Sequence, residues 1–327
     1  MLRYLIVWRV NAPLVWLAGC PAVEFSRTLG AMIADRLPTS EARHWRKALA
    51  PWEETGKSVT IPELAWPIEA VLFTYPGKLA YGQGEPILWE LKLLGQYADH
   101  GFFLEVILPA MEQATTTRDP RWWRPRQIWG RFDIESVYAA RGNQWEPFVR
   151  AGQLDLSYRA TPHQWAEGLI FDVPRETNRV FDHLTWITPF DLPSPETAPA
   201  APARQARRPH RPRRIQAHQV PSLNTILEAL IARLTVFLPG RHHTPDQVWN
   251  SLDEEERASL QEALAQASRI PVHHHNLQRP SRHWPGQWIG DQHFPSIPSP
   301  LIPYLELASI LHVGKQTHFG CGTFVIA

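Results

Sequence analysis

The stretch AVLFTYPGKLAYGQGEPILWELKLLG, residues 70–95, combines two strand-forming segments with a turn between them. Its two ends, residues 70–76 and 86–95, are rich in aromatic and branched apolar residues, which favour β-strands. Between them, the segment GQGEP at residues 82–86 has the glycines and the proline that are typical of a turn. The stretch therefore predicts two strands that flank a turn.

The segments on either side extend this pattern. Residues 2–10, LRYLIVWRV, are typical of a strand, and residues 24–37 repeat apolar side chains at helical spacing. Residues 99–114 favour a helix, and residues 126–139 return to strand-forming composition. The order strand–helix–strand–strand–helix–strand is that of a ferredoxin-like domain.

The second half of the chain also has mixed helical and strand character. Residues 222–238 carry one apolar stripe behind Ser222, a candidate N-cap. Ser251 and Glu254 form a capping-box pattern at the start of a second helix. A helix over residues 299–312 then leads into a last strand. We therefore predict an α+β protein with two tandem ferredoxin-like (RRM-like) domains.

Proline and arginine accumulate between the two halves. Residues 189–221 hold eight prolines, and residues 201–221 hold six arginines and no acidic residue. One interpretation is a flexible linker or connecting strand between an N-terminal domain at 1–188 and a C-terminal domain at 222–327. The other is an arm that contacts phosphates. The arginines assigned to such an arm are Arg207, Arg208, Arg211, Arg213 and Arg214.

Composition excludes some classes of protein. The net charge of +1 gives no indication of a nucleic-acid partner, so charge has to be judged locally. Two cysteines, Cys20 and Cys321, are too few for a disulfide framework and favour a reducing cytosol. No apolar run reaches the ~18–20 residues of a membrane-spanning helix. We expect a cytoplasmic protein with no membrane partner.

The N-terminal segment allows one competing hypothesis. LAGC at residues 17–20 resembles the cleavage box of a bacterial lipoprotein, which would carry lipid on Cys20. Arg9, Asn11 and Pro13 interrupt the apolar run that such a signal requires. We therefore favour a strand over the first ten residues.

The C-terminal stretch LHVGKQTHFGCGTFVI, residues 311–326, places a basic, glycine-rich loop between two apolar runs. Glycines at 314, 320 and 322 permit positive φ and a close approach of the backbone to a ligand. Backbone N–H groups in such loops form concavities for phosphate oxygens. The alternative is a tight β-turn in a packed hairpin, in which the glycines serve sterics alone.

The side chains of this loop suit an RNA ligand. Lys315 supplies a positive charge for a phosphate. His312, His318 and Phe319 have rings that stack on a base or, for the histidines, hydrogen-bond to a sugar.

The same stretch resembles the C-terminal glycine-rich motif of the CRISPR repeat-processing endoribonucleases of the RAMP superfamily, whose common form is near HIGKGTTFGLG. Residues 84–114 resemble that family's strand and following helix, and residues 24–37 its first-domain helix. Gln316 and His318 depart from the motif, and the cysteine cluster of many relatives is missing. The matching residues are His312, Gly314, Lys315, Thr317, Phe319, Gly320 and Gly322.

The resemblance implies binding of CRISPR repeat RNA and cleavage within the repeat, without metal or cofactor, to give guide RNAs. It also implies association with other subunits of a CRISPR effector complex in antiviral defence. The alternative is a RAMP subunit that binds the RNA hairpin without cutting it. The residues expected to contact RNA are Gly314, Lys315, Thr317, His318, Phe319, Gly320, Gly322, Arg279 and Arg282.

RNA is cleaved without metal because its own 2′-hydroxyl is the nucleophile. Histidine suits the proton transfers near neutral pH, and lysine or arginine suits the charge of the transition state. In the family that this chain resembles, the active histidine follows the first helix, where this sequence has His44 in EARHWRK. We expect His44 as acid or base with Lys47 or Arg46 as its electrostatic partner, and His312 as the second candidate. The alternative is a solvated helix face.

The run His273–His275 suggests a metal site. Neighbouring histidines in a strand point to opposite faces, so three in a row rarely bind one ion. No cysteine or carboxylate partner lies at a standard spacing. We predict no metal site here.

Overall fold

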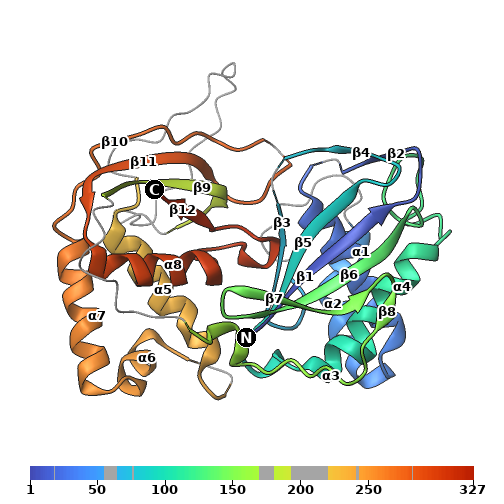
Figure 1. Cartoon of the computed structure of the whole chain (residues 1–327), viewed down its shortest axis with the longest axis horizontal. Coiled ribbons are helices and arrows are strands. Elements are labelled where there is room, and N and C mark those ends of the chain that lie inside the picture. Colours follow the sequence, from blue (N-terminus) through green and yellow to red (C-terminus); the bar gives the residue numbers. More distant parts are fainter. Residues whose placement is uncertain are drawn as a thin grey trace. The chain divides into compact units, whose positions relative to one another are not determined.

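The computed structural model describes residues 1–17, 19–54, 65–75, 77–168, 180–192, 220–240, 243–281 and 283–327. The chain divides into two compact units (Figure 1). Unit 1 comprises Met1–Leu169 and His318–Gly320, and unit 2 comprises Ile170–Thr317 and Cys321–Ala327. The main element of each unit is an antiparallel sheet with helices packed on it. The fold is therefore α+β with two ferredoxin-like units, as the sequence predicts.

Unit 1 is built on a six-stranded sheet. From edge to edge, its strands are β3 (Ala70–Thr74), β5 (Pro86–Leu93), β1 (Leu2–Val10), β6 (Phe132–Arg141), β7 (Gln144–Arg150) and β8 (Gln153–Leu154). Its helices are α1 (Pro21–Arg36), α2 (Thr39–Glu54), α3 (His100–Phe102) and α4 (Leu108–Thr116), with a π-helical turn at Phe103–Ile107 and 3-10 turns at Gly95–Tyr97 and Gln164–Ala166. A separate ribbon pairs β2 (Leu14–Trp16) with β4 (Ala80–Gly82).

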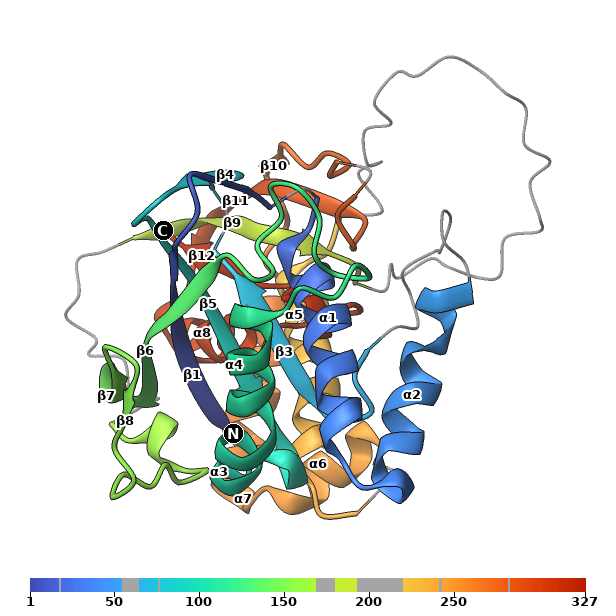
Figure 2. The ribbon, with the colours of Figure 1, turned by 90° about the vertical axis from the view of Figure 1, so that its right-hand side faces the viewer.

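The alternation of side chains along β1 decides which face of this sheet is covered. Tyr4, Ile6 and Trp8 are fully buried, whereas the residues between them are partly exposed. Trp8 packs on Phe25 of α1 with ring centroids 4.8 Å apart, and Tyr4 stacks on Phe103 at 4.0 Å. The helix α1 and the π-helical turn that leads into α4 therefore lie on the aromatic face of the sheet (Figure 2). The strand predicted over residues 2–10 is confirmed.

Unit 2 contains a four-stranded sheet with the order β10 (His274–His275), β11 (Trp288–Ile297), β9 (Phe181–Phe190) and β12 (Phe324–Ile326). Its helices are α5 (Leu223–Leu234), α6 (Pro245–Ser251), α7 (Glu254–Ala267) and α8 (Ile302–Leu311), with 3-10 turns at Thr235–Phe237 and Ser299–Leu301. A further 3-10 turn, Thr317–Phe319, lies in the glycine-rich loop.

Two helix starts in unit 2 test the predicted caps. The Ser222 hydroxyl accepts a hydrogen bond from the Thr225 N–H at 3.1 Å, which confirms Ser222 as the N-cap of α5. The capping box predicted from Ser251 is wrong by two residues. Asp253 accepts from the Glu256 N–H at 2.8 Å, and the Glu256 carboxylate accepts from the Asp253 N–H at 3.0 Å. Ser251 instead ends the preceding helix, α6.

The division into units differs from the predicted boundary at residue 188. Strand β9 pairs with β11 and β12, so it belongs to the sheet of unit 2. Unit 1 also includes the short segment His318–Gly320 from the C-terminal loop. The predicted linker at 189–221 falls for the most part outside the described residues, so its assignment stays a prediction.

Cys20, the residue of the possible lipidation site, lies in the core of the fold. Cys20 has 4% of its surface exposed, and burial raises the pKa of its thiol to about 12. In the described part of the chain, no helix combines the length and the apolar character needed to cross a bilayer.

Candidate functional site

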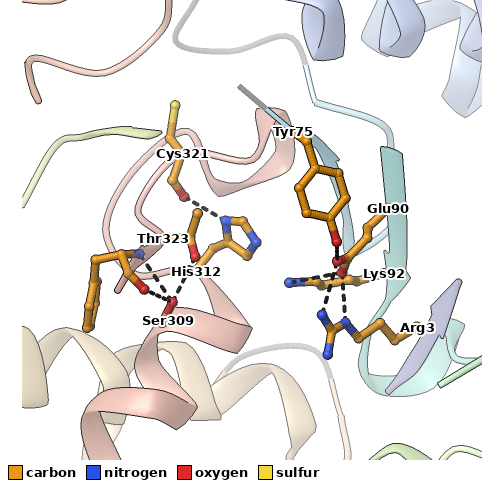
Figure 3. Close-up of polar contacts among 9 residues, drawn as sticks. Arg3, Tyr75, Glu90, Lys92, Ser309, His312, Cys321 and Thr323 are labelled. Atoms are coloured by element: carbon orange, nitrogen blue, oxygen red, sulfur yellow. Dashed lines mark hydrogen bonds and ion pairs between the residues drawn. The ribbon is translucent and has the colours of Figure 1, made fainter. Parts of the chain in front are cut away.

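The base of the glycine-rich loop is closed by hydrogen bonds between α8 and the start of β12 (Figure 3). Helix α8 ends at Leu311, and its C-cap residue His312 has a φ of +59°. The buried His312 imidazole donates from Nδ1 to the Cys321 carbonyl at 3.2 Å, because a carbonyl oxygen only accepts. One turn earlier, the Ser309 hydroxyl contacts Thr323 Oγ1 at 2.8 Å and donates to the Phe324 carbonyl at 2.6 Å. His312, the second candidate for catalysis, therefore lies inside the base of the loop.

The glycines of this loop make room for the protein's own backbone. A Cβ atom on Gly322 would lie 1.9 Å from the Val313 carbonyl oxygen, and one on Gly320 would lie 2.8 Å from that of Leu72. Gly314 is in the same situation, and all three have positive φ. These contacts favour the tight-turn interpretation of the glycines over the expectation that they clear space for a ligand.

His318 anchors the tip of the loop in unit 1. Its Nδ1 donates to the Ala70 carbonyl at 2.9 Å, and its Nε2 accepts from the Ser26 hydroxyl at 2.7 Å. The Trp66 N–H also points to Nε2 at 3.4 Å. His318 and Phe319 have only 7% and 3% of their surfaces exposed. This position differs from the predicted stacking on a base, because both rings are enclosed by protein.

We expect His318→Phe to destabilise the protein by about 2–4 kcal/mol, since it leaves a carbonyl and a hydroxyl buried without their partner. Ser26→Ala removes only one of the contacts of His318 and should cost about 1 kcal/mol. Urea denaturation followed by tryptophan fluorescence measures both. Equal stability of His318→Phe and the wild type would contradict the anchoring role.

Helix α2 carries the predicted catalytic residues on its exposed face. Pro38 precedes the helix, and its carbonyl accepts from the Ala42 N–H at 2.8 Å. Trp45 is buried and packs on Trp66 with ring centroids 5.3 Å apart, which fixes the rotation of the helix about its axis. Spacings of three and four residues place the polar side chains together on the opposite face. The exposed residues of this face are Arg43, His44, Arg46 and Lys47.

The helix and the loop tip share one aromatic cluster in unit 1. Trp66 contacts Trp45 of α2 on one side and His318 on the other, where the ring centroids are 5.5 Å apart. The Trp66 indole N–H also donates to the Ser26 carbonyl at 2.8 Å. The cluster therefore couples the backbone that carries His44 to the segment His318–Gly320.

The other predicted RNA contacts are distributed differently. Lys315 is exposed, with its backbone N–H held by the Asp191 carbonyl at 3.0 Å, and Thr317 is half-buried. Arg279 is exposed and lies over the Trp288 ring at 4.8 Å. The predicted contacts that fall outside the described residues are Arg207, Arg208, Arg211, Arg213, Arg214 and Arg282.

The sequence pattern did not predict a charged cluster that lies on the sheet of unit 1 (Figure 3). Glu90 is 1% exposed and accepts two hydrogen bonds from Arg3, at 2.7 and 3.0 Å, and one from the Tyr75 hydroxyl. Lys92 Nζ lies 3.8 Å from the same carboxylate. Burial alone would raise the pKa of Glu90, but Lys92 and Arg3 outweigh it and the pKa is lowered. Charged residues at alternate positions of an otherwise apolar strand were the available signal.

Three imidazoles form a ladder across the sheet of unit 2. His274, His293 and His183 stand opposite one another on β10, β11 and β9. The rings of His274 and His293 stack at 4.0 Å, and those of His293 and His183 at 5.4 Å. Asp182 contacts His183 at 3.1 Å, and Asp291 precedes the ladder by two residues on β11. Among the described residues, no group of three ligating side chains is placed to hold a metal ion.

The histidine ladder makes stability depend on pH. The pKa of His293 is lowered by burial first, and then by the positive charges of protonated His274 and His183, against the opposing effect of Asp182 and Asp291. Below the ordinary histidine pKa of about 6.5, the unfolded chain therefore binds a proton that the native state resists.

We expect Tm to fall as pH decreases from about 7.5 to about 5.5, and to fall less in His293→Gln. Thermal melts across this range measure the difference, with the exposed His163→Gln as the control. An identical pH profile for His293→Gln and the wild type would contradict the linkage.

No protein-family model matches the sequence, and no curated protein matches it. A partial Cas6-RT-Cas1–Cas2 complex and a Cas6-RT-Cas1–Cas2 complex each match all of this chain with 13% identity and a TM-score of 0.50. This chain spans 45% of the matched chain in the first and 28% in the second. Cas6 of Thermus thermophilus matches 100% of this chain and 98% of its own with 14% identity, at a TM-score of 0.43 that is too low to establish a shared fold.

The first two matches show the fold. The matched regions cover the whole of this chain, so both ferredoxin-like units take part in the likeness. At 13% sequence identity, these matches do not show which reaction this chain catalyses. These two solved structures contain Cas6, and the fold of this chain is like theirs.

Proposed function

We propose that this protein is an endoribonuclease that binds CRISPR repeat RNA and cleaves the precursor transcript into guide RNAs. The observation that carries the proposal is the exposed face of α2, where His44 lies with Arg43, Arg46 and Lys47 on a helix fixed by Trp45. The Cas6-like fold and the exposed Lys315 of the glycine-rich loop support the same class of substrate. We also propose a cytoplasmic location and association with other CRISPR effector subunits.

The proposed reaction uses the RNA's own 2′-hydroxyl and needs no metal ion. A base removes the proton from the 2′-oxygen, which attacks the adjacent phosphorus as the bond to the 5′-oxygen breaks. An acid protonates the leaving 5′-oxygen, so the products are a 2′,3′-cyclic phosphate and a 5′-hydroxyl. His44 performs one of the two proton transfers, and Lys47 or Arg46 stabilises the negative charge on the phosphorane.

Incubation of the protein with repeat RNA in excess EDTA tests the proposal. We expect cleavage at one position within the repeat, with a 2′,3′-cyclic phosphate on the upstream product. RNA binding without cleavage would overturn the enzymatic part and leave the alternative, a RAMP subunit that holds the RNA hairpin. Absence of both binding and cleavage would overturn the whole proposal.

A further inference from the structure

A second basic segment lies in unit 1, between α4 and β6, and we call residues 117–131 the Arg–Trp loop (Figure 2). Its sequence is TRDPRWWRPRQIWGR, with five arginines, one aspartate and three tryptophans. Five positive charges less one negative charge give a net charge of +4 in this segment, against +1 for the whole chain. This described segment is therefore strongly basic, although the whole chain is nearly neutral.

The arginines of the Arg–Trp loop are arranged around two indole rings. The guanidinium groups of Arg118 and Arg131 lie over the Trp123 ring, 5.8 and 4.6 Å from its centroid. Trp122 has Arg121 at 5.7 Å and, from α1, Arg27 at 5.3 Å. Stacking on an indole orients the planar guanidinium and reduces the entropy that it loses on binding.

Part of this charge is not neutralised by carboxylates. Arg121 is paired with Asp119 at 2.6 Å, a contact that lowers the pKa of Asp119. Arg118, Arg124 and Arg126 are exposed, and none of them forms a salt bridge within the part of the chain that the structure describes. Three guanidinium groups are thus available to anions in solution.

The loop has a defined conformation. Arg131 donates to the carbonyls of Arg124 and Gln127 at 2.6 and 2.8 Å, which closes the second half of the loop on itself. Trp129 is fully buried, and its indole N–H donates to Glu24 of α1 at 2.9 Å. A solvated charge run would lack such internal contacts. The exposed arginines therefore stand on a preorganised support, which lowers the entropic cost of binding.

The Arg–Trp loop and the glycine-rich loop occupy equivalent places in the two ferredoxin-like units. The first joins α4 to β6 in unit 1, and the second joins α8 to β12 in unit 2. In both units this connection runs from the second ferredoxin helix to the fourth strand. Within the described glycine-rich loop, Lys315 is the exposed cation. The larger positive charge lies on the Arg–Trp loop.

We propose that the Arg–Trp loop is a second RNA-binding surface, which holds the phosphodiester backbone through Arg118, Arg124 and Arg126. The inference rests on the proposed function for the identity of the nucleic acid. Guanidinium groups bind phosphate oxygens through paired N–H donors, and contacts of this kind position a strand without reading its sequence. The loop therefore adds affinity and salt dependence, while recognition of the repeat belongs to other residues.

The test compares the wild type with the triple variant Arg118→Gln, Arg124→Gln, Arg126→Gln. Fluorescence anisotropy gives Kd for repeat RNA and for a scrambled RNA of equal length over a series of salt concentrations. For single strands, each lost phosphate contact lowers the slope of log Kd against log salt by about 0.7, so we expect a loss of about 2. At about 0.1 M salt, Kd should rise by roughly tenfold or more for both RNAs.

Two further variants isolate the cause. The triple variant Arg36→Gln, Arg150→Gln, Arg269→Gln removes three exposed arginines outside the loop and should leave Kd within about twofold. Replacing the three loop arginines by lysine keeps their charge and should retain most of the salt slope.

The outcomes separate this inference from the proposed function. If the wild type cleaves repeat RNA but the loop variant keeps its Kd and salt slope, the inference is overturned, and the loop is left as a surface for an acidic protein. If the wild type does not cleave but the loop variant loses RNA affinity, the inference stands and the proposed function fails. If the wild type binds neither RNA, both fail.

Discussion

His44→Ala will cleave repeat RNA about 10²–10⁴ times more slowly than the wild type and will bind the RNA with nearly the same Kd. A histidine that transfers a proton in the transition state contributes to the rate, whereas one side chain among several cations contributes little to ground-state affinity. The residue is exposed on α2, and its neighbour Trp45 keeps the helix in place, so truncation at His44 leaves the packing intact. Single-turnover cleavage with enzyme in excess measures the rate without product release.

The matched control for this variant is His163→Ala. His163 is an exposed histidine of unit 1 outside α2, and its removal should change neither rate nor Kd. Lys47→Ala should also slow cleavage, by a smaller factor than His44→Ala if Arg46 supplies part of the charge. Cleavage by His44→Ala at the wild-type rate would exclude His44 from the reaction.

Gly322→Ala will destabilise the protein severely, by about 4 kcal/mol or more, or prevent its soluble expression. Its added Cβ would lie 1.9 Å from the Val313 carbonyl oxygen, so the two limbs of the glycine-rich loop have to separate. That movement breaks the hydrogen bond from the Val313 N–H to the Gly322 carbonyl, which is 3.0 Å long. The φ of +84° adds a conformational cost of about 1–2 kcal/mol. Chemical denaturation measures the total.

Gly152→Ala isolates the steric part of this effect. Gly152 has a φ of +75°, similar to that of Gly322, but a Cβ there meets no atom within 4 Å. The substitution should cost only the conformational term of about 1–2 kcal/mol. Similar stabilities for the two variants would show that the loop adapts to a side chain at 322, and would contradict the tight-turn interpretation.

Local pattern predicted the first unit well because its elements follow one another in the ferredoxin-like order. In β1, the buried residues Tyr4, Ile6 and Trp8 alternate with partly exposed residues, which is the pattern of a strand that packs on one face. The capping box in unit 2 failed because Ser251–Glu254 and Asp253–Glu256 have the same spacing and both suit a cap. Ser251 is excluded as the cap because it is the last residue of α6, a helix end that the local pattern does not reveal.

Long-range contacts account for what the sequence could not reveal. Strand β9 pairs with β11 and β12, whose residues lie about a hundred or more positions further along the chain, so proximity in sequence does not reveal that its partners belong to unit 2. The anchoring of His318 depends on Ser26, which is 292 residues away. A glycine-rich motif with histidine and phenylalanine is compatible with both a ligand and a packed turn, and local pattern does not distinguish them.

Repeat RNA with a single 2′-deoxy nucleotide at the position where the unmodified RNA is cut shows whether the 2′-oxygen is the nucleophile. In EDTA, we expect cleavage of the unmodified RNA and none of the 2′-deoxy RNA, while both bind with the same Kd. This result follows because the 2′-oxygen is the nucleophile. Cleavage of the 2′-deoxy RNA at the same position would exclude this mechanism, since another nucleophile would then attack the phosphorus.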